Sequence, residues 1–159
     1  MKFFRQINNG VPTAINDVPR YDSIENQLKR LLNLLNGTKR WAFSLSPVPF
    51  GLDLAHAPQA KLLAAPYLRA AGTAHAMTLE YAHYEDSTRV RDALGRATPE
   101  LATPTVPITF SLHRHIAFAE EVFTAEQALP IFMHFFRKQA VVPAEYHLRR
   151  LPAKSSQFA

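Results

Sequence analysis

Two segments with the apolar spacing of amphipathic helices lie near the two ends of this chain, and segments of alternating apolar residues lie between them. The first helical segment, 22–36, carries apolar side chains three and four positions apart, which places them on one helix face. The second helical segment begins at Phe123. Successive strands with helices at the two ends predict a mainly antiparallel sheet covered on one face, so we expect an α+β fold of two layers.

Both helical segments begin with residues that are typical of helix N-termini. Asp22 and Glu25 stand three positions apart at the first segment, and Thr124 and Gln127 stand three apart at the second. This spacing predicts a capping box at each helix start, with Asp22 and Thr124 as the capping residues. Pro130 lies inside the second helix, where it removes one backbone hydrogen bond, so we expect a bend there.

Alternating apolar residues, typical of half-buried strands, predict most of the sheet. The predicted strands are 41–45, 52–55, 74–84, 108–112 and 146–148. We expect residues 46–51 to form a turn, because two prolines interrupt a ladder of backbone hydrogen bonds. Residues 115–118 either extend the preceding strand or pair back on it, and residues 58–71 stay open between a short broken helix and a loop.

The length of 159 residues is typical of one domain, so we expect a single domain over 1–159. Residues 1–20 hold an Asn-Gly pair at 9–10, a tight-turn signal that predicts an arm or an early hairpin. Residues 85–107 are polar and contain prolines and a glycine, which is typical of a long loop. We expect the polar tail 152–159 to be frayed.

The chain contains no cysteine, which excludes a disulfide framework, a thiol nucleophile and a thiolate metal site. No apolar run approaches the roughly 20 residues that a membrane-spanning helix needs, and the N-terminus lacks the apolar region of a secretion signal. We therefore expect a soluble, cytoplasmic protein with no membrane partner. The sequence also lacks glycine-rich nucleotide motifs and the G-x-S-x-G motif of hydrolases, so we expect no cofactor and assign no catalytic residue.

The charge balance is basic, with 18 Lys and Arg against 13 Asp and Glu and a net charge of +5. Such a balance is compatible with a nucleic acid or with an acidic protein partner. The basic residues occur in dispersed pairs rather than in a run. This favours a solvated surface over a nucleic-acid groove, and a nucleic-acid-binding module stays the second alternative function.

Three histidines form the candidate metal site of the sequence. His113 and His115 stand two apart on a predicted strand, so both imidazoles point to one face and could meet one ion. A third ligand could come from His83, Glu80 or Asp53. No metal-binding motif accompanies the pair, so exposed strand histidines are the competing interpretation.

Residues 81–86 place aromatic, imidazole and carboxylate groups at a strand end, where such groups can serve in general acid–base chemistry or simply in packing. Together with His113 and His115, His83 in this segment defines the first alternative function. That alternative is a small metal-dependent or acid–base enzyme.

The C-terminal third carries a recognisable series of residues. They are the phrase Phe123-Thr124-Ala125-Glu126-Gln127-Ala128, the helix residues Phe132 and Phe136, the turn Val142-Pro143 and the closing segment Tyr146-His147-Leu148. From Ile108 to Leu151 the chain resembles a family of bacterial immunity proteins, those paired with polymorphic toxins of the deaminase type. Two features depart from that family: Tyr146 stands where a tryptophan is usual, and the segment 85–107 is rich in proline and arginine.

The resemblance implies a small cytoplasmic antitoxin that binds a cognate toxin domain and blocks its active site, with no catalysis of its own. A basic chain fits a toxin domain with an acidic face. We predict Tyr84, Arg89, Arg91 and Arg96 as contacts to this partner, because tyrosine and arginine are favoured interface anchors. Ordinary exposed arginines on a mobile loop are the competing interpretation.

Overall fold

The computed structural model describes residues 2–7, 12–15, 23–48 and 58–153. The strands are β1 (Lys2–Ile7), β2 (Pro12–Ile15), β3 (Ala42–Val48), β4 (Tyr67–Gly72), β5 (Met77–Glu85), β6 (Thr88–Gly95), β7 (Val106–Phe110), β8 (His113–Ala117) and β9 (His147–Arg150). The helices are α1 (Ile24–Asn33), α2 (Gln59–Ala64), the 3-10 helix η1 (Ala119–Glu121) and α3 (Ala125–Arg137).

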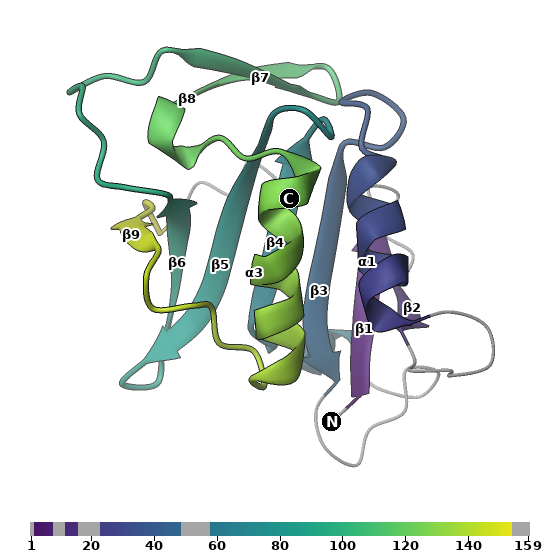
Figure 1. Ribbon diagram of the computed structural model, residues 1–159. Coiled ribbons are helices and arrows are strands. Elements are labelled where there is room, and N and C mark those ends of the chain that lie inside the picture. The colour runs from purple at the N-terminus through teal and green to yellow at the C-terminus, as the bar shows by residue number, and fades with distance from the viewer. Residues whose placement is uncertain (1, 8–11, 16–22, 49–57, 154–159) are drawn as a thin grey trace.

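Within the described residues, seven strands form one antiparallel sheet in the order β2-β1-β3-β4-β5-β6-β9. Helices α1 and α3 lie side by side against one face of this sheet (Figure 1). Strands β7 and β8 form a separate hairpin across one end of the large sheet (Figure 1). The predicted α+β fold, with a sheet packed against an N-terminal and a C-terminal helix, is confirmed.

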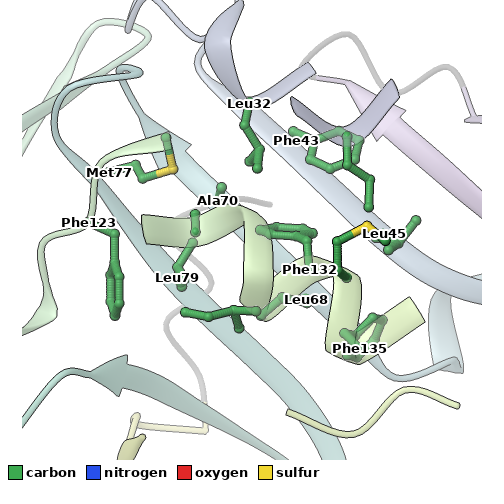
Figure 2. Close-up of a cluster of buried hydrophobic side chains, with 14 of the residues drawn as sticks. Leu32, Phe43, Leu45, Leu68, Ala70, Met77, Leu79, Phe123, Phe132 and Phe135 are labelled. Carbon is green, nitrogen blue, oxygen red and sulfur yellow. The ribbon is translucent and has the colours of Figure 1, made fainter. Parts of the chain in front are cut away.

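The main hydrophobic core lies between the two helices and the sheet. Figure 2 shows side chains of α1 and α3 gathered against side chains of β3, β4 and β5. Phe132 of α3 is fully buried, and its ring centroid lies 5.4 Å from that of Phe43 on β3. Burial of this apolar surface is the main force that holds the helix layer on the sheet.

Both long helices have side-chain caps. At α3, the Thr124 hydroxyl accepts a hydrogen bond from the Gln127 backbone, and the Gln127 side chain accepts one from the Thr124 backbone. The predicted capping box is therefore confirmed there. At α1, the cap is Ser23, whose hydroxyl accepts a hydrogen bond from the backbone N–H of Asn26. The expected cap, Asp22, lies outside the described residues.

The prediction that 85–107 is a long loop is wrong, because this segment contains β6. Strand β6 pairs with β5 across a two-residue turn, Asp86 and Ser87, whose φ angles of 47° and 66° are typical of a type I′ hairpin. Charged residues in β6 interrupt the apolar alternation by which a strand is predicted from the sequence. Arg91 and Asp92 nevertheless bind opposite charges on the neighbouring strands, and these ion pairs offset the desolvation cost of burying them.

The predicted turn at 46–51 is also partly wrong, because β3 continues through Pro47 to Val48. The pairing of β3 with β4 stops at Leu45, whereas its pairing with β1 reaches Val48. Beyond Leu45 the strand has one neighbour instead of two, and a proline without a backbone N–H is tolerated there. The predicted strand 52–55 lies outside the described residues.

The segment 58–71, which the sequence left open, holds α2 and most of β4. The early hairpin is confirmed, since β1 pairs with β2, and its turn lies outside the described residues. Predicted strands 41–45, 74–84 and 146–148 correspond to β3, β5 and β9 with shifted ends.

The hairpin of β7 and β8 resolves the alternatives for residues 115–118. Strand β8 pairs back on β7, in the second of the two predicted ways. The predicted strand 108–112 ends two residues too late, because β7 ends at Phe110 and Leu112 lies in the turn with 98% of its surface exposed. Ser111 before it has a positive φ of 55°, which reverses the chain.

None of the helices in the described ranges has the length and apolar character needed to cross a membrane. Pro130 lies inside α3, and the helix continues beyond it to Arg137. Residues 154–159 of the predicted frayed tail lie outside the described chain.

Candidate functional site

The two faces of the large sheet differ in chemistry. On β5, Leu79, Tyr81 and His83 point toward the helices, and the alternate residues Glu80 and Tyr84 point away from them. We call the second side the rear face: it is the face of β4, β5, β6 and β9 that carries Tyr67, Arg69, Glu80, Tyr84, Arg89, Arg91 and Arg149. The rear face is therefore rich in arginine.

Of the four predicted partner contacts, two bind the C-terminal end of α2. Tyr84 and Arg89 lie opposite one another on β5 and β6. The Tyr84 hydroxyl donates a hydrogen bond to the Ala64 carbonyl at 2.6 Å, and Arg89 Nη2 donates to the Ala65 carbonyl at 3.1 Å. Both side chains therefore tie this segment to the rear face, and both remain exposed at the surface.

The other two predicted contacts also bind their own chain. Arg91 donates from Nη1 to Glu80 at 2.8 Å and from Nη2 to the Pro152 carbonyl at 2.7 Å. Arg96, just after β6, donates from Nη2 to the Ala119 carbonyl at 2.7 Å. The four residues thus do not gather on a mobile loop, and three of them belong to strands of the sheet.

A pocket of about 280 Å³ lies on the rear face between the sheet and the β7–β8 hairpin. Its polar walls carry Thr78, Glu80, Arg91, His115, Glu121 and Arg149. Its apolar walls carry Ala93, Pro104, Ile116, Phe118, Leu151 and Pro152. A concave site with a few converging polar groups on apolar walls is the usual form of a small-ligand site.

Two ion pairs line this pocket. Glu80 Oε1 accepts hydrogen bonds from Arg91 and from the Tyr67 hydroxyl, both at 2.8 Å. Glu121 accepts two hydrogen bonds from Arg149 in a bidentate ion pair, with N···O distances of 2.7 and 2.8 Å. Both carboxylates are almost fully buried, so each needs its arginine to offset the cost of desolvation.

Glu80 is the one carboxylate of the pocket with an incomplete set of partners in the described structure. Its Oε2 atom is buried and accepts no hydrogen bond. A buried acceptor left without a donor costs about 1–3 kcal/mol. Burial, together with the nearby Glu80 charge, also raises the pKa of Tyr67 to about 12, so this phenol stays protonated and keeps donating to Glu80.

The pocket histidine is neutral at pH 7. Burial lowers the pKa of His115 below its usual 6.5, and the nearby Glu121 carboxylate offsets part of this effect. Because the unfolded chain binds a proton near pH 6.5 and the folded chain does not, stability is full above 6.5 and falls as the pH drops toward the lowered pKa.

We expect the His115→Gln variant to lose less stability than the wild type between about pH 7.5 and about pH 5.5, because it lacks this uptake of a proton on unfolding. Urea unfolding at the two pH values measures the difference. His75→Gln, at an exposed turn position, is the control and should behave as the wild type. An unchanged pH dependence in His115→Gln would contradict this role.

A second polar cluster lies on the helix-covered face, where β5, β6 and β9 adjoin. His83 Nε2 lies 2.6 Å from Asp92 Oδ2, and Arg150 binds Asp92 at 2.8 Å and Glu85 at 2.7 Å. The His83 ring stacks on Tyr81 at a centroid distance of 4.3 Å. These groups form a continuous ion-pair network in which each charge has an opposite neighbour.

His83, Glu85 and Asp92 offer ligand atoms within 4.8 Å of one another, the geometry of a metal-binding group. The guanidinium of Arg150 already contacts both carboxylates. A metal ion would have to displace this cation. The arrangement therefore favours a structural ion-pair network over a metal centre.

The predicted metal set of His83, His113 and His115 is not brought together among the described residues. His113 and His115 do share one face of β8, with ring centroids 6.4 and 6.2 Å from that of Phe110. His115 lines the rear-face pocket with Glu80, whereas His83 points to the opposite face of β5. Asp53 lies outside the described residues.

The hairpin of β7 and β8 is anchored by buried residues along its strands and exposed at its turn. Phe110 and Ile108 are buried, and the Phe110 ring stacks on Trp41 at a centroid distance of 5.8 Å. At the tip, Leu112 presents an almost fully exposed apolar side chain. Arg114, two positions further along, is exposed and adds a positive charge.

Sequence reasoning missed the partners Asp92, Glu121, Arg149 and Arg150 of these networks. For Glu80, a further member of these ion-pair networks, the sequence does carry a signal. Its carboxylate lies inside a predicted strand between two apolar residues, Leu79 and Tyr81. Asp92 and Glu121 have no such pattern around them, and the arginines that bind them lie far away in the sequence.

Comparisons of this chain with protein-family models, with curated proteins and with solved structures found no match.

Proposed function

We propose that this protein is a cytoplasmic immunity protein that binds a cognate bacterial toxin domain and covers its active site without catalysis of its own. The observation that carries the proposal is the anchored β7–β8 hairpin with Leu112 at its tip, 98% exposed. An exposed leucine gains about 1.5–3 kcal/mol when a partner buries it. The buried strand residues of the hairpin, Ile108, Phe110 and Ala117, limit the entropy lost when the tip binds.

Charge supports the same kind of partner. The chain carries a net charge of +5, and Arg114 lies beside the apolar tip. Opposite charges on two proteins speed their encounter and select the correct partner. We therefore propose that the toxin domain has an acidic face. The surface of this protein that contacts it extends from Leu112 along the rear face toward Tyr84, Arg89, Arg91 and Arg96.

Further support comes from the resemblance of residues 108–151 to immunity proteins. The residues that carry it have clear packing roles: Thr124 caps α3, Phe132 lies in the core, and Tyr146 packs against that core. These roles maintain a stable platform, which is what a protein that acts by steric blocking needs. Variation of exposed positions on such a platform changes the partner without changing the fold.

The polar clusters favour binding over catalysis. Within the described chain, the side chain that hydrogen-bonds to His83 is Asp92, and Arg150 neutralises Asp92 in turn. A general base needs a nucleophile or a substrate proton within hydrogen-bond reach. The imidazole of His83 is instead held between a ring and a carboxylate.

Co-expression tests the proposal. The proposal predicts that the partner is the C-terminal domain of a large secreted protein encoded beside this chain. We expect a stable one-to-one complex on size-exclusion chromatography and restored growth of cells that make the toxin domain. Absence of both complex and rescue would reject the proposed function.

A further inference from the structure

We propose that the edge of strand β8 opposite β7 binds an extended segment of the toxin domain as an added strand. That segment carries a carboxylate and an apolar side chain two positions apart. This inference rests on the proposed function and deepens it, because it states which structure the partner presents to the hairpin. The edge begins directly after Leu112, the exposed tip residue.

Strand β8 has a neighbour on one edge only among the strands that the structure describes. The small sheet consists of β7 and β8, so the second edge of β8 lies on the side away from β7. The rear-face pocket touches this second edge, because its walls include both His115 and Ile116 but no residue of β7. Consecutive strand residues point to opposite faces, and a pocket that reaches both of them lies beside the strand.

The backbone groups of Arg114 and Ile116 point toward this second edge. On the side of β7, the Ala117 carbonyl accepts a hydrogen bond from the backbone N–H of Thr105, and backbone groups alternate in direction along a strand. The register agrees, because Ile116 lies opposite Pro107, which has no N–H to exchange with it. The N–H and C=O groups of Arg114 and Ile116 are therefore a template for pairing that no described strand occupies.

The side chains of β8 select the added segment. Arg114 and Ile116 stand two apart on one face of the strand, and both are exposed. Arg114 takes part in none of the ion pairs found in the described chain. Residues directly opposite each other on paired strands have Cβ atoms about 4.5–5.5 Å apart. A carboxylate opposite Arg114 and an apolar side chain opposite Ile116 are the complementary pair.

The residue between these two points to the other face of the added strand, where the rear-face pocket lies beside β8. The pocket charges are already paired, Arg91 with Glu80 and Arg149 with Glu121. A charged side chain would add an uncompensated charge to this balanced site, which is unfavourable. The segment that fits β8 therefore reads acidic, uncharged, apolar in either chain direction.

Charge argues against a second copy of this chain as the added strand. Two β8 edges paired about a two-fold axis would place both Arg114 side chains on one face of a short ladder, where like charges repel. The acidic face proposed for the toxin domain supplies the opposite charge instead.

Hydrogen exchange followed by NMR tests the inference on the wild-type protein, alone and in complex with the toxin domain. The amides of Arg114 and Ile116 should exchange rapidly in the free protein and at least about tenfold more slowly in the complex, because the added strand accepts their protons. The Lys138 amide, which donates to the His134 carbonyl at the end of α3 away from the hairpin (Figure 1), is the control and should be unchanged.

Two variants of one position isolate the backbone contact. Ile116→Pro removes an edge N–H, and proline is tolerated there because this N–H does not face β7. Ile116→Ala removes the same apolar side chain but keeps the N–H. We expect Ile116→Pro to bind the toxin domain about tenfold more weakly than Ile116→Ala, because one backbone hydrogen bond is lost. Isothermal titration calorimetry measures both, and circular dichroism checks that both are folded.

A second pair of variants isolates the charge of the edge. Arg114→Glu places a negative charge opposite the expected carboxylate and should weaken the complex about tenfold or more. Arg137→Glu changes the net charge by the same amount, and Arg137 is exposed at the end of α3, away from the hairpin (Figure 1). This control should bind nearly as tightly as the wild type at physiological ionic strength, because salt screens distant charges.

The outcomes separate this inference from the proposed function. A complex in which the Arg114 and Ile116 amides exchange as in the free protein would overturn strand addition and leave the proposed function intact. Equal affinities within either pair of variants, or protection of these amides in a dimer of this chain alone, would also overturn it. If Ile116→Pro does not fold, the exchange of the wild type decides. Absence of any complex rejects the proposed function and this inference with it.

Discussion

Replacing Phe132 by alanine is expected to lower the free energy of unfolding by about 3–5 kcal/mol. Phe132 is fully buried between α3 and the sheet, with its ring against Phe43. The variant loses the burial of the ring and leaves a cavity that rigid neighbours fill only in part. Because domains of this size are stable by about 5–15 kcal/mol, the loss is a large share of the total.

Urea unfolding followed by circular dichroism measures this change as a lower midpoint at an unchanged slope. Leu148→Ala, a partly exposed apolar position on β9, is the control and should cost about 1 kcal/mol or less. A loss below about 1 kcal/mol in Phe132→Ala would contradict the placement of this residue at the centre of the core.

The second large effect concerns binding. We expect Leu112→Asp to weaken the complex with the toxin domain by roughly 100-fold or more, because it removes apolar burial and places a negative charge against an acidic face. Folding should be unaffected, since the side chain lies almost wholly in solvent. Isothermal titration calorimetry with the purified toxin domain measures the dissociation constant.

Val141→Asp is the matched control for this experiment. Val141 is an exposed apolar residue that follows α3, away from the hairpin. The control should bind the toxin domain as the wild type does. If Leu112→Asp binds equally well, the hairpin tip is not the anchor of the complex and the observation that carries the proposed function is lost.

Local signals in the sequence were enough to predict both long helices and strand β5. The capping pair Thr124 and Gln127 marks the start of α3, and the alternation of apolar residues within 74–84 marks a half-buried strand. Each of these features depends on only a few neighbouring residues. Their physical causes, an unsatisfied backbone N–H and a two-residue repeat, act locally and therefore show in the sequence.

Strands β4 and β6 and the continuation of β3 needed information from other parts of the chain. β6 contains Arg89, Arg91 and Asp92, and it is stable in the sheet because Glu80 on β5 binds Arg91 and Arg150 on β9 binds Asp92. Pro47 is tolerated because β4 ends before reaching it. Neither condition can be read from the segment itself.

The candidate site shows the same limit. The sequence predicted correctly that His113 and His115 share a face, because one strand determines it. It did not predict which part of the sheet that hairpin would cover. His83 was therefore grouped with these histidines, although it points to the other face of β5. The pocket residues come from separate strands, and long-range packing alone brings them together.

The most direct test of the whole account is a titration of toxin activity against this protein. If the chain acts by covering the toxin's active site, activity should fall linearly and reach zero at one equivalent, and Leu112→Asp should shift the curve to a large excess. Complete loss of activity at far less than one equivalent would mean that the protein transforms its target catalytically, and it would contradict the central claim. So would full activity in the presence of excess protein.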